Sequence, residues 1–254
     1  MLSTIRTPNF IPRLTFKECR ESIRASKSVI VPVAAMEPFG NIGAVGVSAL
    51  CCIAICDRLS METGVLLSWP VLSGHATPFG VFAGCAGAKQ GMVESVVACI
   101  CRAYAGQGCA RVFIVDGSYD AKEALDSAMR RVRHTITVQI LAWQHDREIR
   151  SLIEARTGVP AHGRCEHALL SMAASIDKSY MREQALDPAR RGDPEACRAW
   201  RRRGRDPERY AKLFPDGLAS DPREPDPVFG KELFENIVHH FAAEMQSLST
   251  AGAP

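Results

Sequence analysis

The chain has 254 residues, of which 46% are hydrophobic and 23% are charged, as is ordinary for a globular protein with a sizeable core. Its formal net charge of +3 is too small to indicate a nucleic-acid or membrane partner. No apolar run reaches the roughly 18 residues that a membrane-spanning helix needs, and the first residues lack the layout of a secretion signal. We therefore expect a cytoplasmic protein with one domain over residues 1–254.

Apolar periodicity predicts an alternation of helices and strands. In chain order, the expected elements are helix 15–25, strand 28–33, helix 48–59 with Ser48 as its N-cap, strand 65–69, helix 92–107, strand 111–115, helix 120–133, strand 136–143 and helix 228–248. Strands separated by helices indicate a parallel sheet covered on both faces, so the fold class is α/β. Ligands bind beyond the carboxyl ends of such strands. The loops that start at Glu37, Ser73, Asp116 and Gln144 are expected to meet there.

The ten cysteines include no C-x-x-C pair, so their spacing indicates neither a zinc ribbon nor a redox motif. Five of them lie in apolar, helix-like stretches: Cys51, Cys52, Cys56, Cys99 and Cys101. Free cysteine in such a stretch behaves as a small apolar side chain, so we expect this group to pack in the core. Cys85 and Cys165 are candidate nucleophiles only where a histidine lies within hydrogen-bond reach.

The composition changes between residues 182 and 227, where arginines alternate with acidic and proline-rich pieces. One interpretation is a basic patch for an anionic partner. The other is a solvated excursion within the domain or a subunit contact. Because acidic residues interleave with the arginines and aromatic residues are few, we favour the second. The apolar residues of the predicted helix 228–248 indicate either core packing or a subunit interface.

Four segments, in order and at fitting spacing, resemble motifs of the creatininase (creatinine amidohydrolase) family. Residues 32–42 (PVAAMEPFGNI) follow the first strand, as the family's PVGSxExHGxH loop does. Residues 115–120 (VDGSYD) match its NGHxxN segment, and residues 162–169 (HGRCEHAL) match its HAGExETS stretch. Residues 216–222 (DGLASDP) resemble the GxxGDP segment that precedes the family's final helix.

The resemblance implies a three-layer α/β/α creatininase-like fold with a mostly parallel central sheet. It also implies a small-molecule ligand and a homo-oligomer, a hexamer by the family's pattern, or a hetero-oligomer with a paralogue. The family uses two divalent metal ions to activate water and to polarise an amide or lactam carbonyl. Such a centre needs several carboxylate and imidazole ligands, so the residues at the matching positions indicate which chemistry the chain retains.

Most positions that match the family's metal ligands hold unsuitable residues. Glu37 keeps the first carboxylate, and Asp120 stands where some members have a glutamate. Phe39 and Ser118 replace histidines, and Ser48 replaces the carboxylate that bridges the two ions. Phenylalanine has no donor atom, and a hydroxyl is a poor ligand for such cations. We therefore expect no metal cofactor of the family's two-ion design.

Ionisable and polar residues nevertheless remain in the matching loops. The expected catalytic acid/base residues are Glu37, Asp120, His162 and Glu166, and the expected substrate-binding residues are His75, Tyr119 and His167. His162 matches a histidine that acts near the substrate in creatininases. The alternative is a site for one divalent ion such as zinc, made from Glu37, Asp120 and His167 or His75. Each lone histidine is also compatible with a purely structural or surface role.

Three functions are compatible with these residues. The first is a repurposed enzyme that acts on a small amide, lactam or related metabolite by acid/base chemistry. General acid/base catalysis typically contributes 10²–10⁴-fold, which suits isomerisation, cyclisation or the opening of an activated ring. The second is a catalytically silent structural or regulatory subunit of a creatininase-like oligomer. The third is a metal-dependent amidohydrolase with displaced ligands.

Overall fold

The computed structural model describes residues 5–74, 77–158, 161, 165–182, 195–196, 206–219 and 224–250. Its strands are β1 (Ser28–Val33), β2 (Leu66–Leu67), β3 (Arg111–Asp116) and β4 (Thr137–Leu141). All neighbouring strands pair in parallel, in the order β2-β1-β3-β4. The expected mostly parallel sheet is confirmed. Most of the arginine-rich stretch 182–227 lies outside the described residues.

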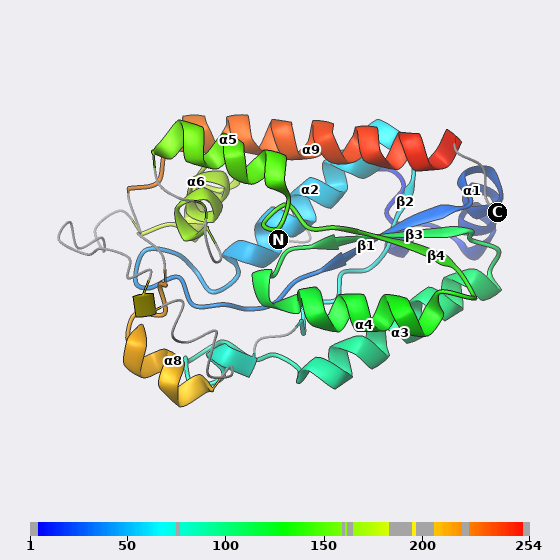
Figure 1. Cartoon of the computed structure of the whole chain (residues 1–254). Helices are drawn as coiled ribbons and strands as arrows, with labels where there is room; N and C mark the ends of the chain where they lie inside the picture. The colour runs from blue at the N-terminus through cyan, green and yellow to red at the C-terminus, as the bar shows by residue number, and fades with distance from the viewer. Residues whose placement is uncertain are drawn as a thin grey trace.

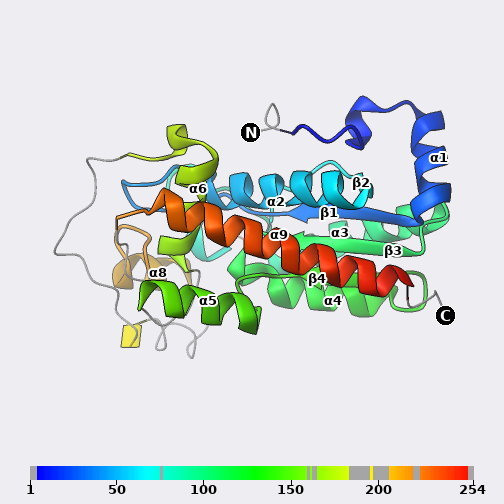
Figure 2. The same cartoon turned by 90° about the horizontal axis from the view of Figure 1, so that it is seen from above.

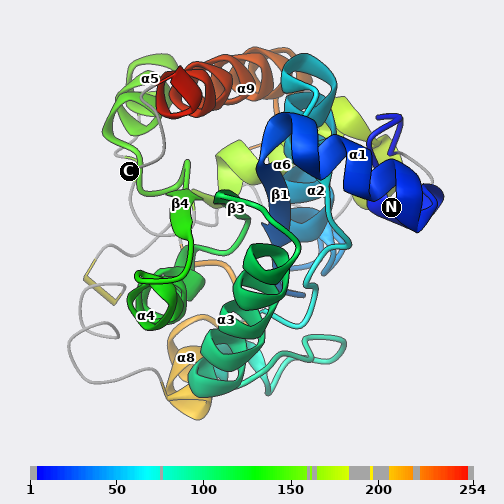
Figure 3. The same ribbon diagram turned by 90° about the vertical axis from the view of Figure 1, so that its right-hand side faces the viewer.

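Helices cover both faces of this sheet, as Figure 1 shows. The α-helices are α1 (Phe16–Ser26), α2 (Val47–Thr63), α3 (Gln90–Gly106), α4 (Lys122–Val132), α5 (Arg147–Thr157), α6 (Glu166–Ile176), α8 (Pro207–Leu213) and α9 (Pro227–Thr250). Helices α2, α5, α6 and α9 lie on one side, and α3 and α4 lie on the other. Figure 2 places α1 at the end of the sheet where β1 begins, and Figure 3 looks onto the layers from that end.

The alternation of side chains along each strand explains the three layers. Every residue of β1 is buried, as expected for a strand with helices on both faces. Ile30 and Phe113 join the apolar cluster beneath α2, α6 and α9. Val31 and Ile114 join the cluster beneath α3 and α4. Successive side chains of a strand point to opposite faces, so one short apolar run serves both cores.

The sequence prediction missed or misplaced several elements. β2 is shorter than the expected strand 65–69, because Trp69 is 54% exposed and the next residue, Pro70, has no N–H for a ladder. The prediction also missed α5, α6 and α8 entirely. Asp146 begins α5 by accepting hydrogen bonds from the backbone N–H groups of Glu148 and Ile149, an ordinary N-cap arrangement.

Two smaller expectations were wrong. Ser48 is not an N-cap, because α2 begins at Val47 after Gly46. Of the five cysteines expected in the core, Cys99 is solvent-exposed, whereas the other four are buried. Among the described residues, no helix is both long and apolar enough to cross a membrane.

Candidate active site at the carboxyl edge of the sheet

The ends of β1 and β3 bring two loops together. Val33 pairs with Asp116, the last residue of β3, and the N–H of Gly117 donates to the carbonyl of Val33 at 2.9 Å. A Cβ atom on Gly117 would lie 2.5 Å from the Cβ of Cys52 in α2. Only glycine fits there, because a real Cβ cannot approach another so closely. The chain can therefore turn directly from β3 across the start of α2.

Glu37 lies where these loops meet and is completely buried. The hydroxyl of Ser48, in the first turn of α2, donates to its Oε2 atom at 2.5 Å. The hydroxyl of Ser118, two residues past β3, donates to its Oε1 atom at 3.1 Å. A buried carboxylate needs such hydrogen bonds to offset the loss of water. The two serines that replace expected metal ligands therefore hold the remaining glutamate.

Asp116 is a second buried carboxyl group beside Glu37, with an exposed fraction of 1%. Its Oδ1 atom accepts the N–H of Ser118 at 2.9 Å, whereas its Oδ2 atom has no hydrogen-bond partner among the described residues. Burial raises the pKa of Asp116 well above its usual range. The hydrogen bond from Ser118 opposes this shift, and the charges of Glu37 and Asp120 add to it. The surroundings of Asp116 therefore favour its protonated form more than water does.

Asp120 and Tyr119 belong to a short 3-10 helix, Tyr119–Ala121, between β3 and α4. Asp120 is only 2% exposed. The ring of Tyr119 stacks on that of His145, with centroids 4.5 Å apart, and His145 Nε2 lies 2.9 Å from the Tyr119 carbonyl oxygen. Burial lowers the pKa of His145. The loop after β4 thus contacts the loop after β3, as the expected meeting of the loops requires.

Two of the remaining predicted site residues, Glu166 and His167, begin α6, and the other two fall outside the described residues. Glu166, the first residue of α6, is fully buried, and one of its carboxylate oxygens accepts the N–H of Ala219 at 2.9 Å. His167 stacks on Phe229 of α9, with centroids 6.0 Å apart. His75 and His162 lie outside the described residues. The roles predicted for these four residues stay predictions.

The two candidate nucleophiles occupy different surroundings. Cys85 belongs to a small buried cluster with Phe79 and Phe214. Cys165 immediately precedes α6 and has a positive φ of 53°. A nucleophilic cysteine needs a base within hydrogen-bond reach, and the covalent mechanism stays a hypothesis.

The residues that the structure describes at this edge do not fit a two-ion metal centre. Both oxygens of Glu37 accept serine hydroxyls, and Phe39 is a fully buried member of the apolar cluster beneath α2, α6 and α9. Within the described ranges, no group of three or more histidine, cysteine, aspartate or glutamate side chains is arranged to hold a metal ion. Hydroxyl and phenyl groups do not replace the charged and imidazole ligands of such a centre.

Asp116 and the two serines were not among the functional residues predicted from the sequence. Asp116 had one local signal, since it is an acidic residue that ends an apolar strand and so lies at the ligand-binding edge of a parallel sheet. Ser118 was expected only as a lost metal ligand, and Ser48 only as a lost ligand and a helix N-cap. Their hydrogen bonds to Glu37 depend on contacts across 11 and 81 residues of sequence, which a local pattern does not reveal.

Comparisons with known proteins agree with this architecture. The family model Creatininase (creatinine amidohydrolase) matches residues 12–245. A tryptophan-to-phenylalanine mutant of creatininase, Type II, has a TM-score of 0.73 and 19% sequence identity, and the match covers 95% of this chain and 98% of that chain. A mutant creatininase of the Zn-Zn type has a TM-score of 0.72 and 19% sequence identity, and the match covers 95% of this chain and 98% of that chain. A putative creatinine amidohydrolase from Bacteroides fragilis has a TM-score of 0.71 at 12% identity, and the match covers 96% of this chain and 97% of that chain.

No curated protein matches the sequence. The structural likenesses, all at low identity, concern the fold, which is the three-layer creatininase fold that the sequence motifs imply. The family model spans most of the chain, from the segment before α1 to the last turns of α9. The chain therefore belongs to the creatinine amidohydrolase (creatininase) family.

Proposed function

We propose that this chain is an enzyme that acts on a small amide, lactam or related metabolite by acid/base chemistry, without the two-metal centre of its family. The observation that carries the proposal is the hydrogen-bonded Glu37 beside Asp116. The serine hydroxyls donate to both oxygens of Glu37 and so favour its ionised form. Burial opposes ionisation of both groups, but at Asp116, whose Oδ1 atom accepts the N–H of Ser118, burial outweighs the hydrogen bond and raises the pKa.

Two carboxyl groups whose surroundings favour opposite protonation states form a natural acid/base pair. Glu37 would accept a proton from the substrate, and Asp116 would donate one to a carbonyl oxygen or a leaving nitrogen. Asp120 adds negative charge that raises the pKa of Asp116 further. Such a pair typically accelerates a reaction 10²–10⁴-fold. This acceleration suits isomerisation, cyclisation or the opening of an activated ring better than the hydrolysis of an ordinary amide.

A second function, a silent structural or regulatory subunit, is favoured by a different observation. Glu37, Asp116 and Asp120 are at most 2% exposed, and Phe39 fills space in the adjoining core. Substrate reaches the acid/base pair only if the covering segments move. A silent subunit needs no such movement, and the same hydrogen bonds would then serve only to stabilise the loops.

The experiment that separates these functions compares the wild type with Glu37→Gln, which keeps the shape of the side chain and removes its charge. Both proteins, treated with a chelator, are screened by thermal unfolding against small lactams, linear amides and guanidines. A ligand at 100 times its Kd stabilises the folded state by about 2.7 kcal/mol, or roughly 5–10 °C for a chain of this size. Mass spectrometry then follows conversion of each ligand that raises the melting temperature.

The acid/base proposal predicts a ligand that the wild type both binds and converts, and that Glu37→Gln converts at least 100-fold more slowly. Far-UV circular dichroism checks that the variant is folded. Binding without conversion, or no response to any of the three classes, would contradict the enzyme and favour the silent subunit.

A further inference from the structure

The helix α3 is apolar on its outer face as well as on the face that packs against the sheet. Its inner face includes the buried residues Val93, Val97 and Cys101. Its outer face carries a line of five solvent-exposed residues, which we call the α3 seam, flanked on one side by the exposed Ser95 and Arg102: Met92, Val96, Cys99, Ala103 and Gly106. Met92 is 60% exposed and Val96 is 46% exposed. A helix that is apolar all round is normally covered on all sides.

The spacing of the α3 seam indicates what covers it. Successive members are four, three, four and three residues apart, which is the 3.5-residue repeat of a helix that packs along its length against another helix. The charged residues of α3 are Glu94 and Arg102. Glu94 pairs with Arg131 of α4 at 3.1 Å. Neither Glu94 nor Arg102 belongs to the seam. The exposed line is therefore uncharged over its whole length.

The order of side chains along the α3 seam is self-complementary. The larger residues, Met92 and Val96, lie in its first half, and the smaller ones, Ala103 and Gly106, lie in its second half. A Cβ atom added to Gly106 would meet nothing within 4 Å, so the surface beside it is open. An antiparallel copy of the same helix places Met92 opposite Gly106 and Val96 opposite Ala103. Facing large with small residues is how two helices interdigitate.

We propose that α3 of one chain packs antiparallel against α3 of a second copy, about a two-fold axis at Cys99. The same surface then serves both partners, as in most symmetric homodimers. The axis places the two exposed thiols of Cys99 next to each other. This interface goes beyond the catalytic proposal and does not depend on it.

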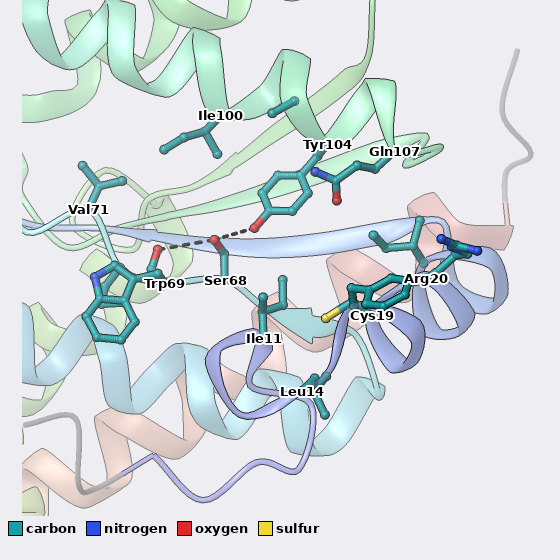
Figure 4. A pocket seen from close by; sticks show the side chains of 14 residues that line it. Ile11, Leu14, Cys19, Arg20, Ser68, Trp69, Val71, Ile100, Tyr104 and Gln107 are labelled. Carbon is teal, nitrogen blue, oxygen red and sulfur yellow. Dashed lines mark hydrogen bonds between the residues drawn. The ribbon is translucent and has the colours of Figure 1, made fainter.

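Apolar surface beside the α3 seam extends the interface. A groove of about 850 Å³ runs between α1, the segment after β2 and α3, and Figure 4 shows Ile100 and Tyr104 of α3 facing the side of the groove that carries Trp69. Trp69 is 54% exposed, and Phe16 on the α1 side is 77% exposed. A specific dimer buries about 800 Å² on each partner, more than one helix pair supplies, and this groove provides adjoining apolar surface.

The first test is the oligomeric state, measured by sedimentation equilibrium of the full chain in reducing buffer. We expect the wild type to form dimers or larger symmetric assemblies at micromolar concentration. Val96→Glu places two unpaired charges in the contact and should weaken association at least 100-fold. Val228→Glu is the matched control, because Val228 is 73% exposed on α9, and its association should be unchanged. A monomeric wild type, or a Val96→Glu variant that assembles normally, would overturn the proposal.

The second test uses covalent cross-linking and requires no destabilising change. Mild oxidation with diamide should join two wild-type chains through Cys99, and Cys99→Ser should abolish this product. Cys19→Ser is the control, because Cys19 is only partly exposed and its loss should leave the cross-link intact. Retention of the cross-linked dimer in Cys99→Ser would contradict the proposed axis.

The direction of packing is tested in chains that lack Cys19 and Cys99. A mixture of one chain with Met92→Cys and another with Gly106→Cys should cross-link on oxidation. The chain with Met92→Cys alone should not, because antiparallel packing holds the two copies of that residue far apart. Cross-linking of Met92→Cys with itself would indicate a parallel contact and exclude the antiparallel one.

Discussion

In the middle of the sheet, the described strands present apolar side chains to the helices on each side, such as Phe113 on one face and Ile114 on the other, and these are fully buried. At the carboxyl edge, the buried side chains are instead Asp116, which ends β3, and Glu37 and Asp120, which lie four residues beyond the ends of β1 and β3. Burial stabilises the first group, whereas it penalises the ionised form of the second. The middle of the sheet is explained by folding alone. At the carboxyl edge, burying the carboxyl groups lowers the stability of the folded state. Ionisable residues that are buried despite this penalty indicate a functional site.

The largest difference between the two regions should appear when a side chain is truncated in the middle of the sheet. Phe113→Ala should lower the free energy of unfolding by about 3–5 kcal/mol, because it removes buried apolar contacts and leaves a cavity. Urea denaturation measures the change. A loss of less than 1 kcal/mol would show that this core collapses around the gap, and would weaken the contrast with the edge.

At the carboxyl edge, truncating a small polar side chain should cost more than its size suggests. Ser48→Ala and Ser118→Ala each leave one oxygen of the buried Glu37 without its serine donor, and each should cost about 1–3 kcal/mol. Ser95→Ala is the matched control, because its hydroxyl makes an exposed bond to the Gly91 carbonyl. Equal, small effects in all three variants would mean that Glu37 does not depend on the two serines.

The raised pKa of Asp116 predicts how stability depends on pH. Between about pH 4, the usual pKa of aspartate, and its raised folded-state pKa, Asp116 keeps a proton when folded and loses it when unfolded. The free energy of unfolding attributable to Asp116 should therefore fall as pH rises, by at most about 1.4 kcal/mol per pH unit. Below about pH 4 both states are protonated and the contribution levels off.

Asp116→Asn removes this titration and keeps the shape of the side chain. Urea denaturation from pH 4 to pH 8 measures the free energy of unfolding of both proteins. The value for the wild type, relative to that for the variant, should fall as pH rises. Parallel pH profiles for the two proteins would show that Asp116 is ionised in the folded state at neutral pH, and would remove the proposed proton donor.

The smallest effect is expected at a surface ion pair. Arg58 contacts Glu62 at 2.7 Å and Glu235 at 3.2 Å, and its side chain is 42% exposed. Arg58→Ala should change the free energy of unfolding by less than about 1 kcal/mol, because water screens exposed charges. A loss comparable with that of Ser48→Ala would show that the edge residues are not special in this chain.

The sequence predicted the parts of the fold that depend on local pattern. The apolar runs of β1 and β3 and the acidic Glu37 after β1 were placed correctly. The role of Ser48 was not, because a serine near the start of a helix usually caps it, and its bond to Glu37 exists only after the loops meet. Helix α6 was missed because most of its residues are buried, so it lacks the one-sided apolar pattern that reveals a surface helix.

The central claim, that the carboxyl edge works without its family's two-metal centre, is tested most directly by metal analysis. The wild type and a variant that combines Phe39→His, Ser48→Asp and Ser118→His are produced in cells grown with excess zinc and manganese, purified and dialysed. Inductively coupled plasma mass spectrometry then measures the number of metal ions bound per chain. The account predicts far less than one ion per chain in the wild type and a clear gain in the folded variant. One or two tightly held ions per wild-type chain, lost in Glu37→Gln, would contradict it.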